Sequence, residues 1–210
     1  RRAVVLASIA AQDRLTDALR ADLLAADTKT RLEDLYLPYK PKRRTKAQIA
    51  REAGLAPLAE TLLADPQQAP ETLAGAYVDA QRGVADAKAA LDGARQILME
   101  TFAEDAELLG RLRELLWTDG VLASRVVDGR QDEGAKFSDY FDFAEPLHKV
   151  PSHRALALLR GRNEGFLNVT LVLDSEINED AIKPGPGPCE QRIAARFGIK
   201  AQQRPADKWL

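Results

Sequence analysis

The sequence lacks the features that identify several large classes of protein. Its 210 residues include one cysteine, so no disulfide can form within the chain, as is typical of the reducing cytoplasm. No run approaches the roughly 20 apolar residues of a membrane-spanning helix, and no signal-peptide pattern opens the chain. We therefore expect a cytoplasmic protein that has no membrane partner.

Motifs for catalysis and metal binding are also scarce. The sequence has no Cys-x-x-Cys pair, no His-x-Glu motif and no glycine-rich phosphate loop. Gly185 and Gly187 alternate with prolines, which lack the N–H that a phosphate cradle needs. His148 and His153 stand far from Cys189 in the sequence, and a cap or core-edge role for His153 is simpler than a shared metal ion. We expect no catalytic residue, no metal site and no cofactor.

Charge is balanced over the whole chain, so any attraction to nucleic acid must be local. Lys and Arg number 30 against 32 Asp and Glu, which gives a formal net charge of −2. Hydrophobic residues make up 45% of the sequence, enough for a packed core in one large domain or two small ones.

Apolar periodicity predicts a mainly α-helical fold in which short connections join the helices. The third helix begins at Thr28 or at Thr30, and the second choice has a capping-box spacing to Glu33. The predicted helices cover residues 1–12, 17–26, 28–36, 46–53, 57–64, 70–76, 83–102, 103–119, 151–162 and 190–197.

Two features of the second half complete the predicted fold. The long helices 83–102 and 103–119 are expected to form an antiparallel hairpin. Residues 166–173 alternate between apolar and polar side chains, the best strand pattern in the chain. A lone strand is not stable, so we expect a partner within residues 121–128 or outside the chain.

Residues 136–143 are rich in aromatic side chains. They include Phe137, Tyr140, Phe141 and Phe143. We interpret them as pinning a short helix to a core, because aromatic rings bury large areas. Asp139, Asp142 and Glu145 lie beside them and argue against a base-stacking platform at this place.

The chain is predicted to contain three segments. Residues 1–65 form a helical subdomain with a helix-turn-helix-like unit, and residues 66–150 form the subdomain of the helical hairpin. Residues 151–210 form a small mixed α/β piece that leads into a truncated downstream domain. The fold class is thus mainly α with a small mixed part.

The stretch of residues 31–58, RLEDLYLPYKPKRRTKAQIAREAGLAPL, holds the strongest local charge. Pro38 and Pro41 stop a helix and keep the chain extended. No acidic residue occurs between Asp34 and Glu52, and the basic run there consists of Lys40, Lys42, Arg43, Arg44, Lys46 and Arg51. Clustered cations on a stiff loop suit non-specific contact with phosphates. The alternative is a solvated loop whose cations pair with nearby acids.

Residues 48–62, QIAREAGLAPLAETL, resemble a helix-turn-helix in which Gly54 marks the turn. A DNA reader places Arg, Asn, Gln or Lys at the start of its second helix to meet base edges. Here that helix starts with Ala56, Pro57 and Ala59. We therefore expect a structural unit, and no reading of base sequence.

The basic stretch and two later ones resemble a known family. The later stretches are LDGARQILMETFAEDAELLGRLRELLW (91–117) and KFSDYFDFAEPLHKVPSHRALALLRGRNEG (136–165). Together they closely resemble the Tex proteins, bacterial transcription-accessory factors, and this resemblance implies a nucleic-acid-binding scaffold without an established reaction. The chain starts at Arg1 without Met, so we expect a fragment. The resemblance implies a further short N-terminal part, an RNase H-like domain, helix-hairpin-helix modules and an S1 domain.

We therefore expect the non-catalytic scaffold half of a transcription-accessory protein, which presents the basic run to phosphates. Its expected partner is non-specific nucleic acid, RNA or single-stranded DNA, bound mainly through the S1 domain, with the transcription machinery as a second partner. Two alternatives stay open. One is a docking domain for proteins that touches no nucleic acid, and the other is a part of an RNase H-like nuclease.

Overall fold

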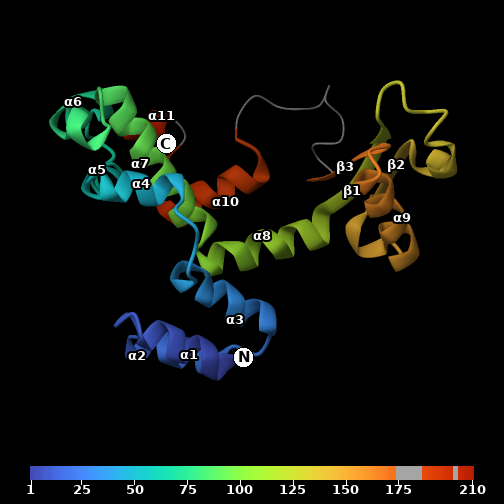
Figure 1. Ribbon diagram of the computed structural model, residues 1–210, viewed down its shortest axis with the longest axis horizontal. Helices are drawn as coiled ribbons and strands as arrows, with labels where there is room; N and C mark the ends of the chain where they lie inside the picture. The colour runs from blue at the N-terminus through green and yellow to red at the C-terminus, as the bar shows by residue number, and fades with distance from the viewer. Residues whose placement is uncertain (174–185, 201–202) are drawn as a thin grey trace. The chain divides into compact units, whose positions relative to one another are not determined.

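The computed structural model describes residues 1–173, 186–200 and 203–210 (Figure 1). As the sequence predicts, the described chain is mainly α-helical, with one small antiparallel sheet. None of the helices in these ranges combines the length and the apolar character needed to cross a bilayer.

The chain divides into two compact units. The first joins Arg1–Gly110 to Pro186–Leu210, and the second is Arg111–Gly185. Helix α8 (Ala106–Asp119) contains the boundary between them. Separate folding of the segments 1–65, 66–150 and 151–210 stays a prediction.

The first unit consists of helices, short 3-10 turns and connecting loops. Its elements are α1 (Arg2–Ala10), α2 (Asp17–Ala25), α3 (Lys29–Tyr36), η1 (Leu37–Tyr39), α4 (Lys46–Glu52), α5 (Ala56–Ala64), α6 (Pro70–Ala74), η2 (Gly75–Tyr77), η3 (Ala80–Arg82), α7 (Ala87–Ala103), α10 (Pro188–Phe197) and α11 (Pro205–Trp209).

The first three helices share a small core of their own. Its buried residues are Val5, Ile9, Leu23, Ala26, Leu32 and Tyr36. Of the two threonines that could begin α3, Thr28 is the cap, because its Oγ1 accepts a hydrogen bond from the Arg31 N–H at 3.1 Å. The alternative capping box of Thr30 and Glu33 is wrong, and the Glu33 carboxylate instead pairs with Arg1 at 2.5 Å.

A second core lies among α4, α5, α6 and α7. The face of α7 that enters it consists of Ala90, Leu91, Ala94, Ile97 and Leu98. Helix α7 packs against α4, α5 and α6 through this face. The sequence predicted instead that α7 packs against α8 in an antiparallel hairpin. The glycine within α7 has a packing reason, since a Cβ at Gly93 would lie 2.4 Å from Leu55 Cδ1.

The predicted helix-turn-helix-like unit is present as α4 and α5. Gly54 turns the chain between them with φ of +87°, a conformation that glycine adopts without steric cost. On α5, the side chains of Leu58, Ala59 and Leu62 are fully buried in the core shared with α7. The residues of α5 that remain exposed are Pro57, Glu60 and Ala64.

The second unit contains a three-stranded antiparallel sheet with the order β2-β1-β3. Strand β1 (Gly120–Val126) lies in the middle, between β2 (Asp142–Pro146) and β3 (Leu167–Leu173). The predicted strand at 166–173 thus finds its partner within the range 121–128, as expected. Strand β2 was not predicted.

The remaining elements of the second unit are η4 (Ala135–Tyr140), η5 (Leu147–Lys149) and α9 (Ser152–Asn163). Phe137 on η4 packs with Leu158 on α9 and Leu167 on β3 in the core. The prediction that the aromatic segment pins a short helix to a core is confirmed for Phe137, which is 5% exposed.

Candidate nucleic-acid interface

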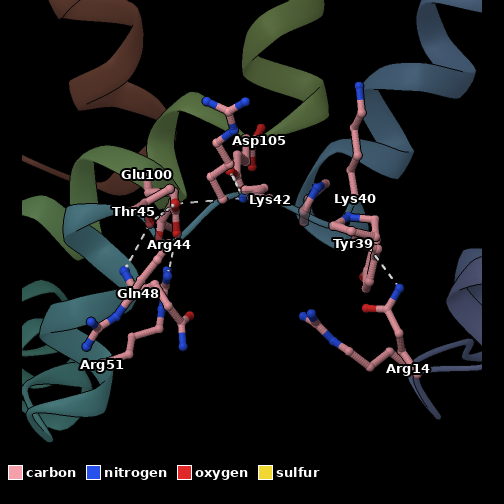
Figure 2. A pocket seen from close by; sticks show the side chains of 16 residues that line it. Arg14, Tyr39, Lys40, Lys42, Arg44, Thr45, Gln48, Arg51, Glu100 and Asp105 are labelled. Carbon is pink, nitrogen blue, oxygen red and sulfur yellow. Dashed lines mark hydrogen bonds and ion pairs between the residues drawn. The ribbon is translucent and has the colours of Figure 1, made fainter.

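The predicted basic run lines one side of a pocket of about 670 Å³ in the first unit (Figure 2). The loop between α1 and α2, the loop after η1, helix α4 and the end of α7 enclose it. The lining residues are Gln12, Arg14, Pro38, Tyr39, Lys40, Pro41, Lys42, Arg43, Arg44, Thr45, Gln48, Arg51, Glu100, Thr101, Glu104 and Asp105.

The loop between η1 and α4 is extended at its start, before Pro41, and ends at the N-cap of α4. Lys40 ends η1 in an extended conformation, with φ −68° and ψ 128°, as expected for the residue before Pro41. At the other end, Thr45 Oγ1 accepts a hydrogen bond from the Gln48 N–H at 3.0 Å and begins α4. The residues between these two ends have exposed side chains.

Glu100, near the end of α7, interacts with three other residues that line the pocket. Its carboxylate pairs with Arg51, accepts a hydrogen bond from Thr45 Oγ1 at 3.0 Å and lies 3.8 Å from Lys42 Nζ, which also pairs with Glu104. Burial raises the pKa of Glu100, but the hydrogen bonds from Arg51 and Thr45 and the charge of Lys42 outweigh it and leave the pKa below its usual value. The Glu100 side chain is 15% exposed.

A second, more exposed ion pair joins Arg44 to Glu52 at 2.5 Å. Hydrogen bonds from Arg44 and Gln48 lower the pKa of the Glu52 carboxyl. Three members of the basic run are therefore paired within the molecule. These paired cations are Lys42, Arg44 and Arg51.

The other three members of the run are exposed, and none of them forms an ion pair with a residue that the structure describes. These open cations are Lys40, Arg43 and Lys46. Figure 2 shows the Lys40 side chain extending away from the group around Glu100. The structure thus brings five of the six predicted residues to the pocket and leaves Lys46 outside its lining.

Arg14 belongs to the pocket as well, although sequence reasoning did not find it. Its guanidinium carbon lies 4.6 Å from the centroid of the Tyr39 ring. Helix α1 ends in a turn in which Asp13 has φ of +54°. In this turn the Arg14 N–H donates a hydrogen bond to Ile9 O at 3.3 Å. No sequence signal places Arg14 beside the basic run, because this turn and the packing of α1 on α3 bring them together.

The pocket keeps an excess of positive charge. Six cationic side chains and three carboxylates line it, which leaves three formal positive charges. One of those carboxylates, Asp105, also pairs with Arg196 of α10 at 2.7 Å. Burial raises the pKa of Asp105, but hydrogen bonds from Arg196 and the Leu108 N–H outweigh it and lower the pKa. The formal charge of the pocket lining is therefore positive at neutral pH.

The histidines and the cysteine do not join this pocket. His148 lies in η5, His153 in the first turn of α9, and Cys189 in α10. Among residues 1–173, 186–200 and 203–210, no group of three His, Cys, Asp or Glu side chains is arranged to hold a metal ion. Gly185 lies outside the described residues, so the expectation for that segment stays a prediction.

Residues 65–210 match a family model described as Tex central region-like. Over the whole chain the sequence is 56% identical to "Protein YhgF" of Escherichia coli (strain K12) and 56% identical to "Transcriptional accessory protein Tex" of Neisseria gonorrhoeae. In each case all of this chain aligns with 27% of the relative, so the chain spans about a quarter of the length of these relatives.

A more distant relative occurs in animals. The human "S1 RNA-binding domain-containing protein 1" is 25% identical over 178 residues, which cover 80% of this chain and 18% of that protein.

Proposed function

The chain belongs to the Tex family, and on that basis we propose that it is a non-catalytic, cytoplasmic part of a transcription-accessory protein that contacts the phosphates of nucleic acid. The contact is electrostatic and independent of base sequence. The open cations, together with Arg14, carry it. The paired cations maintain the shape of the pocket.

One observation carries this proposal. After the ion pairs within the molecule are counted, the open cations and Arg14 are exposed and form no ion pair with a described residue. A protein that neutralises phosphates with such side chains releases condensed counterions from the nucleic acid, so binding weakens as salt concentration rises. The open cations are therefore the residues that a phosphate backbone can reach without breaking an existing pair.

The burial of α5 supports contact without reading of sequence. Leu58 and Ala59 of α5 have no exposed surface, and Pro57 occupies its first turn. A recognition helix has to present polar side chains to base edges in the major groove. Since the exposed residues of α5 are Pro57, Glu60 and Ala64, with no Arg, Lys, Asn or Gln among them, the α4–α5 pair supports a structural role for the helix-turn-helix-like unit.

The test is a salt titration of binding to a single-stranded RNA of about 12 nucleotides. Combined substitution of the open cations by Glu should lower the slope of log affinity against log salt by about 2, since each lost single-strand phosphate contact accounts for about 0.7. A matched control replaces Arg20, Lys29 and Lys88 by Glu; these residues are exposed in the same unit and do not line the pocket. An unchanged slope in the first variant would remove the proposed site.

The same titration addresses the alternative of a docking domain for the transcription machinery. Such a domain would show no salt-dependent affinity for RNA or DNA in either variant or in the unchanged protein. The human relative is named for an S1 RNA-binding domain, which is the reason to include RNA among the ligands. The nuclease alternative predicts strand cleavage, which gel analysis of the same mixtures would reveal.

A further inference from the structure

Arg14 and Tyr39 form a prearranged pair at the edge of the pocket. The guanidinium of Arg14 lies over the Tyr39 ring, 4.6 Å from its centroid. Gln12 Nε2 donates to the backbone carbonyl of Tyr39 at 2.9 Å, and to Ser8 O at 2.9 Å, so the loop after α1 and the turn η1 are fastened together beside this pair. In Figure 2 the Arg14 and Tyr39 side chains lie close to one another on the side of the pocket opposite Glu100.

The backbone that carries Arg14 is unusual. Asp13 is the one residue other than glycine with positive φ in the described part of the chain. Asp tolerates this left-handed conformation better than most residues but does not adopt it without cost. The left-handed residue precedes Arg14, whose N–H donates to Ile9 O at 3.3 Å and whose guanidinium lies over the Tyr39 ring. Arg14 has no ion-pair partner among the described residues, so its charge is not used for internal pairing.

The chemistry of this pair differs from that of the open cations. A lysine ammonium contacts a phosphate as a point charge. A guanidinium backed by an aromatic ring presents a flat, weakly hydrated surface, and proteins use such surfaces to stack the unpaired bases of single strands. Two of the open cations, Lys40 and Arg43, line the same pocket and can meet the phosphates on either side of a stacked base.

We infer that this pocket binds single-stranded nucleic acid, with one base stacked on the guanidinium of Arg14 and the adjoining phosphates on Lys40 and Arg43. The inference rests on the proposed function and adds to it a base-stacking contact at Arg14. A paired base in a duplex cannot reach the guanidinium because its faces are covered by neighbouring bases. The volume of about 670 Å³ is in the range of pockets that enclose small organic groups.

The test compares Arg14→Lys with the unchanged protein by fluorescence anisotropy. Lysine keeps the charge and loses the flat surface. The probes are a single strand of about 12 nucleotides, the same strand with abasic sites in place of all bases, and a duplex of equal length. We expect Arg14→Lys to weaken binding of the first probe about fivefold, a loss at the low end of what one stacked base contributes. The abasic strand and the duplex should bind both proteins equally.

A second pair of variants guards against a purely structural effect. Tyr39→Phe keeps the ring behind the guanidinium and should bind the single strand as the unchanged protein does. Tyr39→Leu removes the ring and should reproduce the loss seen with Arg14→Lys. Thermal unfolding followed by circular dichroism identifies any variant that is not folded. If Tyr39→Leu does not fold, the Arg14→Lys comparison decides alone.

The outcomes separate this inference from the proposed function. Equal binding of the single strand by Arg14→Lys and the unchanged protein would overturn the inference, and so would an equal loss on all three probes. In both cases the Glu substitutions of the open cations would still lower the salt slope if the proposed function holds. If those substitutions leave the slope unchanged, the proposed function and this inference fail together.

Discussion

The paired cations and the open cations alternate along one loop and one short helix, yet their surroundings differ. The paired cations form ion pairs with carboxylates of Glu52, Glu100 and Glu104, whereas the open cations form no ion pair with a carboxylate that the structure describes. Basic residues that are adjacent in the sequence thus have two different roles: the paired cations stabilise the pocket, and the open cations are available to a ligand. A run of basic residues is therefore not by itself a binding site, because tertiary ion pairs decide which charges remain for a partner.

The largest effect that tests this comparison is on affinity. Replacing all three open cations by Gln should weaken binding of a short single strand about 100-fold at about 0.1 M salt, because each lost phosphate contact accounts for about 0.7 in the salt exponent. Replacing the paired cation Arg44 by Gln should change the affinity by less than about threefold, since its charge is already paired with Glu52 and its removal leaves the Glu100 cluster intact. Equal losses in the two variants would erase the distinction between the sets.

The next effect is on stability. Glu100→Ala should lower the free energy of unfolding by about 2 kcal/mol, because Arg51, Lys42 and Thr45 lose a shared and mostly buried acceptor. Urea denaturation measures the loss. The control Glu60→Ala removes an exposed carboxylate on α5 and should stay within about 0.5 kcal/mol. A Glu100 variant as stable as this control would mean that the paired cations do not hold the pocket.

A third effect is the dependence of stability on pH. The pKa of Glu100 and that of Asp105 are lower in the folded protein than in the unfolded chain, so both carboxyls contribute stability above the unfolded pKa of about 4. That contribution is lost as the pH falls through the lower, folded pKa values. The stability difference between the unchanged protein and Glu100→Ala should therefore shrink below about pH 4. Urea midpoints across the acid range measure it, and a difference that grows on acidification contradicts the assignment.

The smallest effect concerns the most exposed of the paired cations. The Arg44 side chain is 67% exposed and that of its partner Glu52 is 45% exposed. An exposed pair of this kind contributes between about 0 and 1 kcal/mol, so Arg44→Gln should shift the melting temperature by no more than a few degrees. A larger shift would mean that the Arg44–Glu52 pair stabilises the fold as much as the buried pairs of Glu100 do.

Local sequence chemistry was enough to predict much of this fold. Gly54 marks the turn between α4 and α5, Thr45 caps α4, and the apolar face of α7 follows from its spacing. These features depend on residues within one or two helical turns of each other. Strand β2 was missed because its sequence, DFAEP, has no clear alternation and is extended only through its pairing with β1.

The candidate site could be predicted only in part. The basic run itself was visible, and five of its residues line the pocket. The division into two sets was not, because Glu100 and Glu104 are far along the chain and come close only when α4 packs on α7. Arg14 was missed for a related reason, since its position depends on the left-handed turn at Asp13.

Protection of lysines from acetylation by bound nucleic acid would show whether the open cations contact the ligand. The protein would be acetylated briefly, with and without a saturating single-stranded oligonucleotide, and the modified lysines identified by mass spectrometry. We predict that Lys40 and Lys46 react in the free protein and become protected in the complex, that Lys42 reacts slowly in both, and that Lys88 reacts in both. Equal reactivity of Lys40 and Lys46 with and without bound oligonucleotide would contradict the claim.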